Sequence, residues 1–176
     1  FLPVDSRRWR VRQVAALNGL PVIVASGADE SYYAAPKVVS VNLQGEETVL
    51  AAPGMHIANS VVTDVRYGAS NVVLARGDCL YFVATEGYGS QLYRMEASGR
   101  MERLTHGEGM VDGFDVCGSL IVFSGLRDMR LSELYRLDGG SEVPLTTLNG
   151  DVRAPMPEDI HFTNSEGVEV YGLVRR

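Results

Sequence analysis

Gln91-Leu92-Tyr93-Arg94-Met95 recurs 42 residues later as Glu133-Leu134-Tyr135-Arg136-Leu137 (133 − 91 = 42), and this repetition decides the fold. Each copy follows a short apolar run and precedes a glycine turn and a Leu-Thr pair: Leu80–Ala84 with Leu104-Thr105, and Leu120–Ser124 with Leu145-Thr146. A looser copy lies upstream, at residues 38–50. Self-similarity at a period of roughly 40 residues is typical of repeat architectures, so each copy is predicted to be one structural unit.

The local pattern within each unit is that of β-strands. Short runs rich in Val, Ile, Tyr and Phe are bounded by Gly, Asn, Asp or Ser, and no stretch keeps the i, i+3, i+4, i+7 spacing of an amphipathic helix. The clearest runs are Val22–Ala25, Val38–Val41, Leu80–Val83 and Leu120–Phe123. Asn18-Gly19 between two such runs predicts a hairpin turn, because both residues tolerate a positive φ. The chain is therefore predicted to be all-β.

Three four-stranded units are expected, each of the size of a propeller blade. We place them at about residues 9–53, 54–106 and 110–149, so that residues 1–149 form a partial β-propeller. Known propellers typically have four to eight blades, so three leave faces and sheet edges uncovered. The missing blades, or a second copy of the chain in a symmetric homodimer, would cover them. The alternative is a single ligand- or sugar-binding β-sandwich in which the repeat offset is a coincidence.

The repeat ends after Asn149. Residues 150–158 contain Pro155 and Pro157 and little apolar periodicity, which indicates a linker. Beyond it, two alternating runs flank Asn164-Ser165-Glu166-Gly167, a pattern typical of a β-hairpin. Residues 150–176 are thus predicted to be a linker and the first hairpin of a second, truncated domain. The chain also starts without a methionine, and we expect it to be a piece of a longer protein.

Composition excludes several classes of protein. Sixteen basic and 22 acidic residues give 16 − 22 = −6, whereas a nucleic-acid binder carries a basic face. A hydrophobic fraction of 45% is too high for a disordered chain. No apolar run is long enough to span a membrane. We expect no secretory signal, because residues 1–5 lack a basic head and an apolar stretch. The two cysteines, Cys79 and Cys117, are too few for a disulfide framework. We expect turn-flanking or buried thiols and a cytoplasmic location.

The order of several short motifs resembles the late propeller blades and domain junction of the prolyl oligopeptidase family of serine peptidases. Its acylaminoacyl-peptidase-like or dipeptidyl-peptidase-like branch is the most similar. The blade motifs are Phe82–Thr85, Gln91–Arg94 and Leu104–Gly107, and the junction motifs are Leu145-Thr146, Leu148-Asn149, Pro157-Glu158, Phe162–Gly167 and Tyr171-Gly172. Glu166 stands where the family usually has aspartate, and Tyr171 where tryptophan is common. The motifs cover residues 70–174, and residues 1–69 match by blade pattern alone.

This resemblance implies a function for the parent protein. Members of the family join a propeller to an α/β-hydrolase domain and hydrolyse short or N-blocked peptides, and the propeller restricts access to the catalytic cleft. The partners it implies are the missing blades, the hydrolase domain and, for the parent only, a peptide substrate. The alternative function is a non-catalytic propeller that acts as an interaction scaffold, as in periplasmic translocation proteins.

The catalytic groups of such a peptidase are missing from the chain itself. A serine nucleophile would lie on a Gly-x-Ser-x-Gly elbow. Gly68-Ala69-Ser70-Asn71-Val72 and the segment from Gly118-Ser119-Leu120 fail at the last glycine, and Gly87-Tyr88-Gly89-Ser90 places its serine one residue late. His56, His106 and His161 are expected in a loop, in a turn and in the tail strand. We therefore predict no catalytic residue in these 176 residues.

No metal or cofactor site is expected either. The sequence has no Cys-x-x-Cys, His-x-x-x-His or oxygen-rich calcium loop. Asp112 and Asp115 are predicted to lie on opposite faces of a strand, exposed to solvent or in a turn. The Gly87 and Gly89 pair lacks a following helix to receive a phosphate, so we interpret it as a turn. The Tyr32-Tyr33 pair in a long loop is a hypothetical contact for a ligand or partner.

Overall fold

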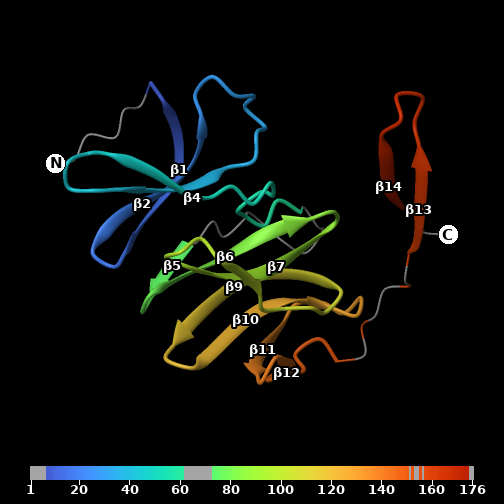
Figure 1. Ribbon diagram of the computed structural model, residues 1–176. Coiled ribbons are helices and arrows are strands. Elements are labelled where there is room, and N and C mark those ends of the chain that lie inside the picture. Colours follow the sequence, from blue (N-terminus) through green and yellow to red (C-terminus); the bar gives the residue numbers. More distant parts are fainter. Residues whose placement is uncertain (1–6, 62–72, 151, 153–154, 156, 175–176) are drawn as a thin grey trace.

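The computed structural model describes residues 7–61, 73–150, 152, 155 and 157–174, and these residues contain fourteen strands and no helix (Figure 1). The first sheet consists of β1 (Trp9–Leu17), β2 (Leu20–Gly27), β3 (Lys37–Val41) and β4 (Glu47–Ala51). The second group is β5 (Val73–Arg76), β6 (Cys79–Glu86), β7 (Gly89–Glu96) and β8 (Met101–Arg103). The third is β9 (Gly109–Cys117), β10 (Leu120–Arg127), β11 (Glu133–Asp138) and β12 (Ser141–Pro144). The prediction of an all-β chain is confirmed.

Each group is a four-stranded antiparallel sheet whose strands pair in chain order. We call them the first, second and third blades. A single parallel pair, Ser90 with Met110, joins β7 to β9, so that the second and third blades form one eight-stranded sheet. The first strands of neighbouring blades touch, β1 against β5 and β5 against β9. The blades do not close into a ring, and the fold is the predicted incomplete β-propeller.

The repeated sequence makes repeated contacts. Phe82 pairs with Tyr93 in the second blade, and their rings stack with centroids 6.0 Å apart. The equivalent pair in the third blade, Phe123 and Tyr135, stacks at 5.1 Å. The Leu-Thr endings are also equivalent, because in both blades the threonine hydroxyl accepts a hydrogen bond of 2.9 Å from the backbone N–H of the third strand's leucine. The 42-residue offset therefore reflects structural repetition.

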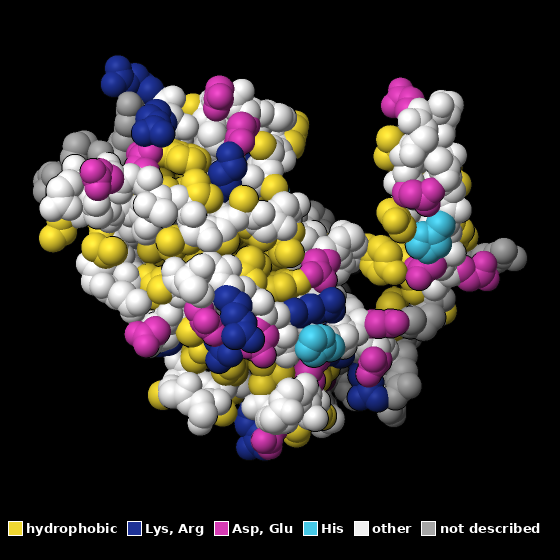
Figure 2. All heavy atoms as spheres, viewed as in Figure 1, with side chains coloured by type: hydrophobic (Ala, Val, Ile, Leu, Met, Phe, Trp, Pro, Cys, Tyr) yellow, Lys and Arg dark blue, Asp and Glu magenta, His cyan; other side chains and the backbone are white. Residues whose placement is uncertain are grey.

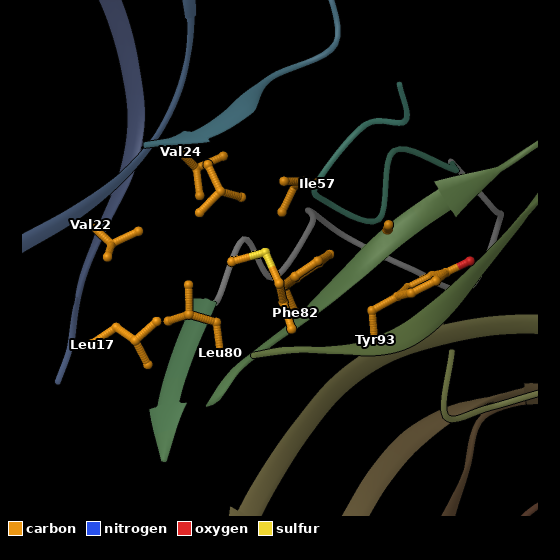
Figure 3. Packing of buried hydrophobic residues seen from close by; sticks show 10 residues of the cluster. Leu17, Val22, Val24, Ile57, Leu80, Phe82 and Tyr93 are labelled. Atoms are coloured by element: carbon orange, nitrogen blue, oxygen red, sulfur yellow. The ribbon is translucent and has the colours of Figure 1, made fainter. Parts of the chain in front are cut away.

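The hydrophobic core lies between the blades. One cluster joins Val22 and Val24 of β2 to Leu80 and Phe82 of β6, with Ile57 between them (Figure 3). A second cluster packs the second blade against the third, and it consists of Val83, Leu92, Val111, Phe123 and Tyr135. Neighbouring residues of β6 thus point to opposite blades, as strand alternation requires. Burial on both faces makes the second blade the centre of the array.

The tail forms a separate two-stranded hairpin, β13 (Glu158–Thr163) and β14 (Glu169–Val174), which stands beside the blades in Figure 1. Its turn is closed by Asn164, whose side-chain oxygen accepts hydrogen bonds from the N–H groups of Glu166 and Val168. The hairpin is the one predicted, whereas the boundary between two domains at residue 150 stays a prediction. None of the described residues forms a helix that could cross a membrane.

Candidate functional site

The connections at the two ends of the blades differ in length. Because the strands alternate in direction, the connections from first to second and from third to fourth strand lie at one end of each blade. These connections are turns of two to five residues: 18–19, 77–78, 118–119, 42–46, 97–100 and 139–140. The other connections lie at the opposite end, and we call the surface they form the long-loop face: residues 28–36, 52–61, 87–88, 104–108 and 128–132. Binding residues concentrate on loops held by a rigid scaffold, so the long-loop face is the candidate functional surface.

His56 on this face is held in a hydrogen-bonded chain with Arg12 and Ser60. Nη1 of Arg12 lies 2.8 Å from Nε2 of His56, and Nδ1 of His56 lies 3.1 Å from Oγ of Ser60. Arginine can only donate, so Nε2 accepts and Nδ1 carries the proton that it donates to Ser60. Burial and the charge of Arg12 lower the pKa of His56. A general base would have to accept a proton from serine, and this tautomer cannot, so the contact fixes the loop and does not activate Ser60.

The rings of the other two histidines make no hydrogen bond to a serine hydroxyl of the described residues. His106 is exposed in the connection after β8, where its backbone N–H donates to Glu142. His161 is exposed on β13 and meets the ring of Tyr171 edge to face, with centroids 4.9 Å apart. The sequence predicted a turn and a tail strand for these two residues, and the structure places them there.

The serines of the near-miss elbows are also accounted for. Ser90 is buried in β7, where its hydroxyl donates to the carbonyl of Val111 and accepts from the N–H of Val111. It thereby fastens β7 to β9. Ser119 lies in the tight turn before β10, at the end opposite the long-loop face. Gly68–Val72 lies outside the described residues.

Asp112 was predicted to be exposed to solvent or in a turn, but the structure places it half-buried within β9. It is the extra residue of a β-bulge in β9, because Val111 pairs with Gly125 and Gly113 with Ser124. Its half-buried carboxylate accepts hydrogen bonds from Asn59 at 3.1 Å and Ser132 at 3.2 Å. Asp115, in contrast, is exposed, as predicted. Asp112 thus ties two connections of the long-loop face together.

The described residues contain no group of three or more His, Cys, Asp or Glu that could hold a metal ion. Cys79 is half-buried and Cys117 is exposed, and both are free thiols next to tight turns.

The Tyr32–Tyr33 pair projects from the longest fully described connection of the face. The side chains are 72% and 84% exposed and meet edge to face, with centroids 5.5 Å apart. The backbone beneath them is fixed, since Arg12 donates to the carbonyl of Tyr32 and Arg10 to those of Gly27 and Glu30. Exposed aromatic residues on a rigid loop suit a binding role, which stays a prediction.

A cavity of about 500 Å³ lies between the second and third blades. Its floor is an ion pair that sequence reasoning missed. Nε of Arg127, whose side chain is 4% exposed, donates to Oε2 of Glu142 at 2.6 Å. Glu142 also accepts from the backbone N–H groups of His106 at 2.8 Å and Gly107 at 3.1 Å. Arg127 lies over the ring of Phe123, 5.0 Å from its centroid.

The electrostatics of this ion pair follow from its burial. Burial by itself raises the pKa of Glu142, but the hydrogen bonds and charge of Arg127 and the two backbone N–H groups outweigh it and lower that pKa below the ordinary value. Comparison of the three blades could have singled out Arg127. It is the last residue of the second strand of its blade, and the equivalent residues are Glu86 in the second blade and Gly27 in the first. A residue that differs from its equivalents in the other blades is a candidate for a function specific to its blade.

A side-chain hydrogen bond joins the hairpin to the long-loop face. The hydroxyl of Tyr88, in the connection between β6 and β7, donates to Oδ1 of Asp159 on β13 at 3.0 Å. This hydrogen bond and the proximity of the carboxylate raise the pKa of Tyr88, because both favour the protonated phenol. The tail therefore lies at the same end of the blades as the long loops.

No protein-family model and no curated protein matches the chain. Solved structures do. The chain is similar to Pyrococcus horikoshii acylaminoacyl peptidase with a TM-score of 0.64 and 21% identity, over 91% of this chain and 24% of that one. It is similar to puromycin hydrolase with a TM-score of 0.65 and 15% identity, over 93% of this chain and 25% of that one. The β-propeller domain of the Trilobed protease from Pyrococcus furiosus matches 77% of this chain and 39% of that one, with a TM-score of 0.54 and 19% identity.

These likenesses establish the fold. The chain spans about a quarter of the length of the first two structures. The acylaminoacyl-peptidase-like character seen in the sequence is confirmed as a resemblance in fold to solved peptidases, one of them represented by its propeller domain.

Proposed function

We propose that the chain is part of the propeller of a larger serine peptidase that hydrolyses short or N-blocked peptides, and that its long-loop face restricts access to the catalytic cleft. The observation that carries this proposal is the hairpin that leaves the third blade and contacts Tyr88 on the long-loop face. A catalytic domain that continues from this hairpin would begin over that face. The fold likeness to acylaminoacyl peptidase and puromycin hydrolase supports the same reaction class.

The hairpin itself supports a continuation into another domain. Residues opposite one another in an antiparallel pair share a face, and the pairs Phe162–Val170 and Glu158–Val174 place Phe162, Val170 and Val174 together with Ile160. Phe162 is 54% and Ile160 is 40% exposed, so this apolar face has no cover among the described residues. A two-stranded hairpin is marginal alone, and further strands of a hydrolase sheet would stabilise it.

The outward face of the third blade supports additional blades. Leu92 of the second blade is fully buried against the third, whereas its equivalent Leu134 is 45% exposed. Leu145 is 51% exposed on the Leu-Thr ending of the same blade. In a longer protein, a further blade would cover this face. In the isolated chain, we propose that two copies associate through it, which sedimentation velocity would detect as a dimer.

The catalytic groups would lie in the missing part. In the described residues, the one serine–histidine contact joins Ser60 to His56. Nδ1 of His56 donates its proton to Ser60 and so cannot accept the serine proton, as a general base must. The propeller would act by exclusion: a short peptide could reach the cleft, and a folded protein could not.

The test is the kinetics of the protein of natural length. We expect it to hydrolyse an N-acetylated dipeptide nitroanilide, to be blocked by a serine-directed inhibitor, and to leave folded proteins intact. Tyr88→Phe should raise the turnover of long peptides relative to short ones, because it loosens the contact with the hairpin. Tyr171→Phe, on the hairpin itself but without a hydrogen bond from its hydroxyl to the described residues, is the control. Equal turnover of short peptides and proteins by the unaltered enzyme would contradict the proposal.

A further inference from the structure

The cavity between the second and third blades is lined by groups from several elements. His106 comes from the connection after β8, Arg127 from the end of β10, Arg130 from the following loop, Tyr135 from β11 and Glu142 from β12. On the face seen in Figure 2, basic, acidic and histidine side chains gather over the lower part of the molecule, where Figure 1 places β9–β12. The volume of the cavity, about 500 Å³, is within the range of small-ligand sites, roughly 300–1,000 Å³.

Arg130 distinguishes this cavity from the other charged surfaces of the chain. Its Nε is buried without a hydrogen-bond partner. Arg10, Arg94 and Arg136 also have a buried, unpartnered Nε, but their guanidinium groups donate elsewhere, to Gly27, Glu102 and Asp138. Among the described residues, the guanidinium of Arg130 makes no hydrogen bond or ion pair. A half-buried cation without a partner is costly, so a bound anion would stabilise it.

The carboxylates of the cavity do not neutralise Arg130. Glu142 is fully engaged by Arg127 and by two backbone N–H groups. Asp128 also lines the cavity, but its side chain is exposed and forms no ion pair with Arg130 in the described residues. One positive charge therefore remains uncompensated at the end of the cavity that lies on the long-loop face.

One neutral donor, the hydroxyl of Tyr135, lines the cavity together with Arg130. Burial raises the pKa of Tyr135, with Asp128 and Glu133 adding to the effect of burial and Arg127 and Arg130 opposing it, so the phenol keeps its proton and can donate. His106 contributes an exposed ring to the same lining.

The loop that presents Arg130 is in an unusual conformation. Asp128 and Met129 have φ values of 53° and 59°, and consecutive non-glycine residues in the left-handed region are strained. The strain is maintained by a hydrogen bond of 2.9 Å from the N–H of Arg130 to the carbonyl of Arg127. Arg130 follows these two residues directly and lines the cavity.

We propose that this cavity is a binding site for a small oxyanion, held by the guanidinium of Arg130 with the hydroxyl of Tyr135 as a second donor. The chemistry fits the free carboxylate of a peptide C-terminus and equally an inorganic phosphate. The cavity is lined by residues of this chain alone, and binding to it can be measured without catalysis, so the proposal does not depend on the proposed peptidase activity.

Titration calorimetry on the 176-residue chain tests the site with three probes: Gly-Gly-Phe as free acid, the same peptide as C-terminal amide, and inorganic phosphate. We expect the free acid or phosphate to bind and the amide not to bind. Arg130→Gln should weaken the binding about tenfold or more, because a charge-assisted hydrogen bond is lost. Arg100→Gln, an exposed arginine in the turn before β8, should leave it unchanged.

Thermal unfolding separates a binding role from a structural one. The guanidinium of Arg130 makes no hydrogen bond or ion pair with the described residues, so Arg130→Gln should keep or raise the Tm while it weakens binding about tenfold or more. Binding of the acid alone identifies a carboxylate site, and binding of phosphate alone identifies a phosphate site. The proposal is overturned if neither the free acid nor phosphate binds, if the amide binds as well as the acid, or if Arg130→Gln binds as tightly as the unaltered chain.

Discussion

Leu92 and Leu134 occupy equivalent positions in consecutive blades, and replacing each by alanine should have unequal effects on stability. Leu92 has no exposed surface because the third blade covers it, whereas Leu134 is 45% exposed on the face that no blade covers. The two residues share their backbone setting, since each precedes the tyrosine that stacks on a phenylalanine. The pair thus isolates the effect of a neighbouring blade.

The expected magnitudes follow from burial. Leu92→Ala removes a fully packed side chain and leaves a cavity, which should lower the free energy of unfolding by about 3 kcal/mol. Leu134→Ala encloses no cavity and removes a side chain that is about half exposed, so a loss of about 1 kcal/mol is expected. The predicted difference between the variants is about 2 kcal/mol.

Urea unfolding of the 176-residue chain, followed by circular dichroism at a concentration where sedimentation detects only monomer, measures both values. In the protein of natural length, where another blade would cover Leu134, both substitutions should cost about 3 kcal/mol. Equal losses in the short chain, or a loss that stays near 1 kcal/mol for Leu134→Ala in the long one, would refute the interpretation of an uncovered blade face.

Other contacts give further predictions. Glu142→Gln leaves Arg127 buried without its counter-charge and should lower the free energy of unfolding by about 3 kcal/mol; an unchanged urea midpoint would contradict this. The lowered pKa of Glu142 also predicts that its contribution, present at neutral pH, is lost as the pH falls below about 4.3. The lowered pKa of His56 means that the unfolded chain binds more protons, so stability should fall as the pH drops through about 6.5, and His56→Asn should remove this step from the pH profile of the Tm. Tyr88→Phe removes the hydrogen bond to Asp159 and should speed amide hydrogen exchange in β13 and β14 without changing exchange in β6; unchanged exchange in the hairpin would show that the contact does not hold it.

The strands were predictable because their signal is local and repeated. Alternating apolar residues and tight glycine turns mark β2, β6 and β10, and the recurrent Leu-Tyr-Arg segment marks β7 and β11. The stacked aromatic pairs and the threonine contacts then follow from the same repeat, because equivalent residues make equivalent bonds.

Side-chain contacts between elements that are not neighbouring strands were not predictable in the same way. Arg127 of β10 and Glu142 of β12 lie in the same blade with β11 between their strands, and nothing near either residue in the sequence indicates its partner. Strand alternation also failed at Asp112, because a bulge inserts one residue into β9 and turns the carboxylate toward Asn59 and Ser132. A residue at Gly125 larger than glycine would meet the carbonyl of Met110 at 2.1 Å, so glycine is required where the two strands close after the bulge.

The absence of a catalytic centre was predicted from the missing Gly-x-Ser-x-Gly motif and stays a prediction. What the sequence could not provide is the direction of the hydrogen bonds at His56. Only the position of the Arg12 guanidinium, 2.8 Å from Nε2, fixes the tautomer that prevents Ser60 from being activated.

The proposal that residues 1–176 belong to a serine peptidase whose nucleophile lies elsewhere is tested most directly by fluorophosphonate labelling. The protein of natural length and the 176-residue chain are each treated with the probe, digested, and analysed by mass spectrometry for the modified serine. We predict one labelled serine in the long protein, located after residue 176, and no labelling of the short chain. A labelled serine within residues 1–176, or an active long protein that the probe does not modify, would contradict the proposal.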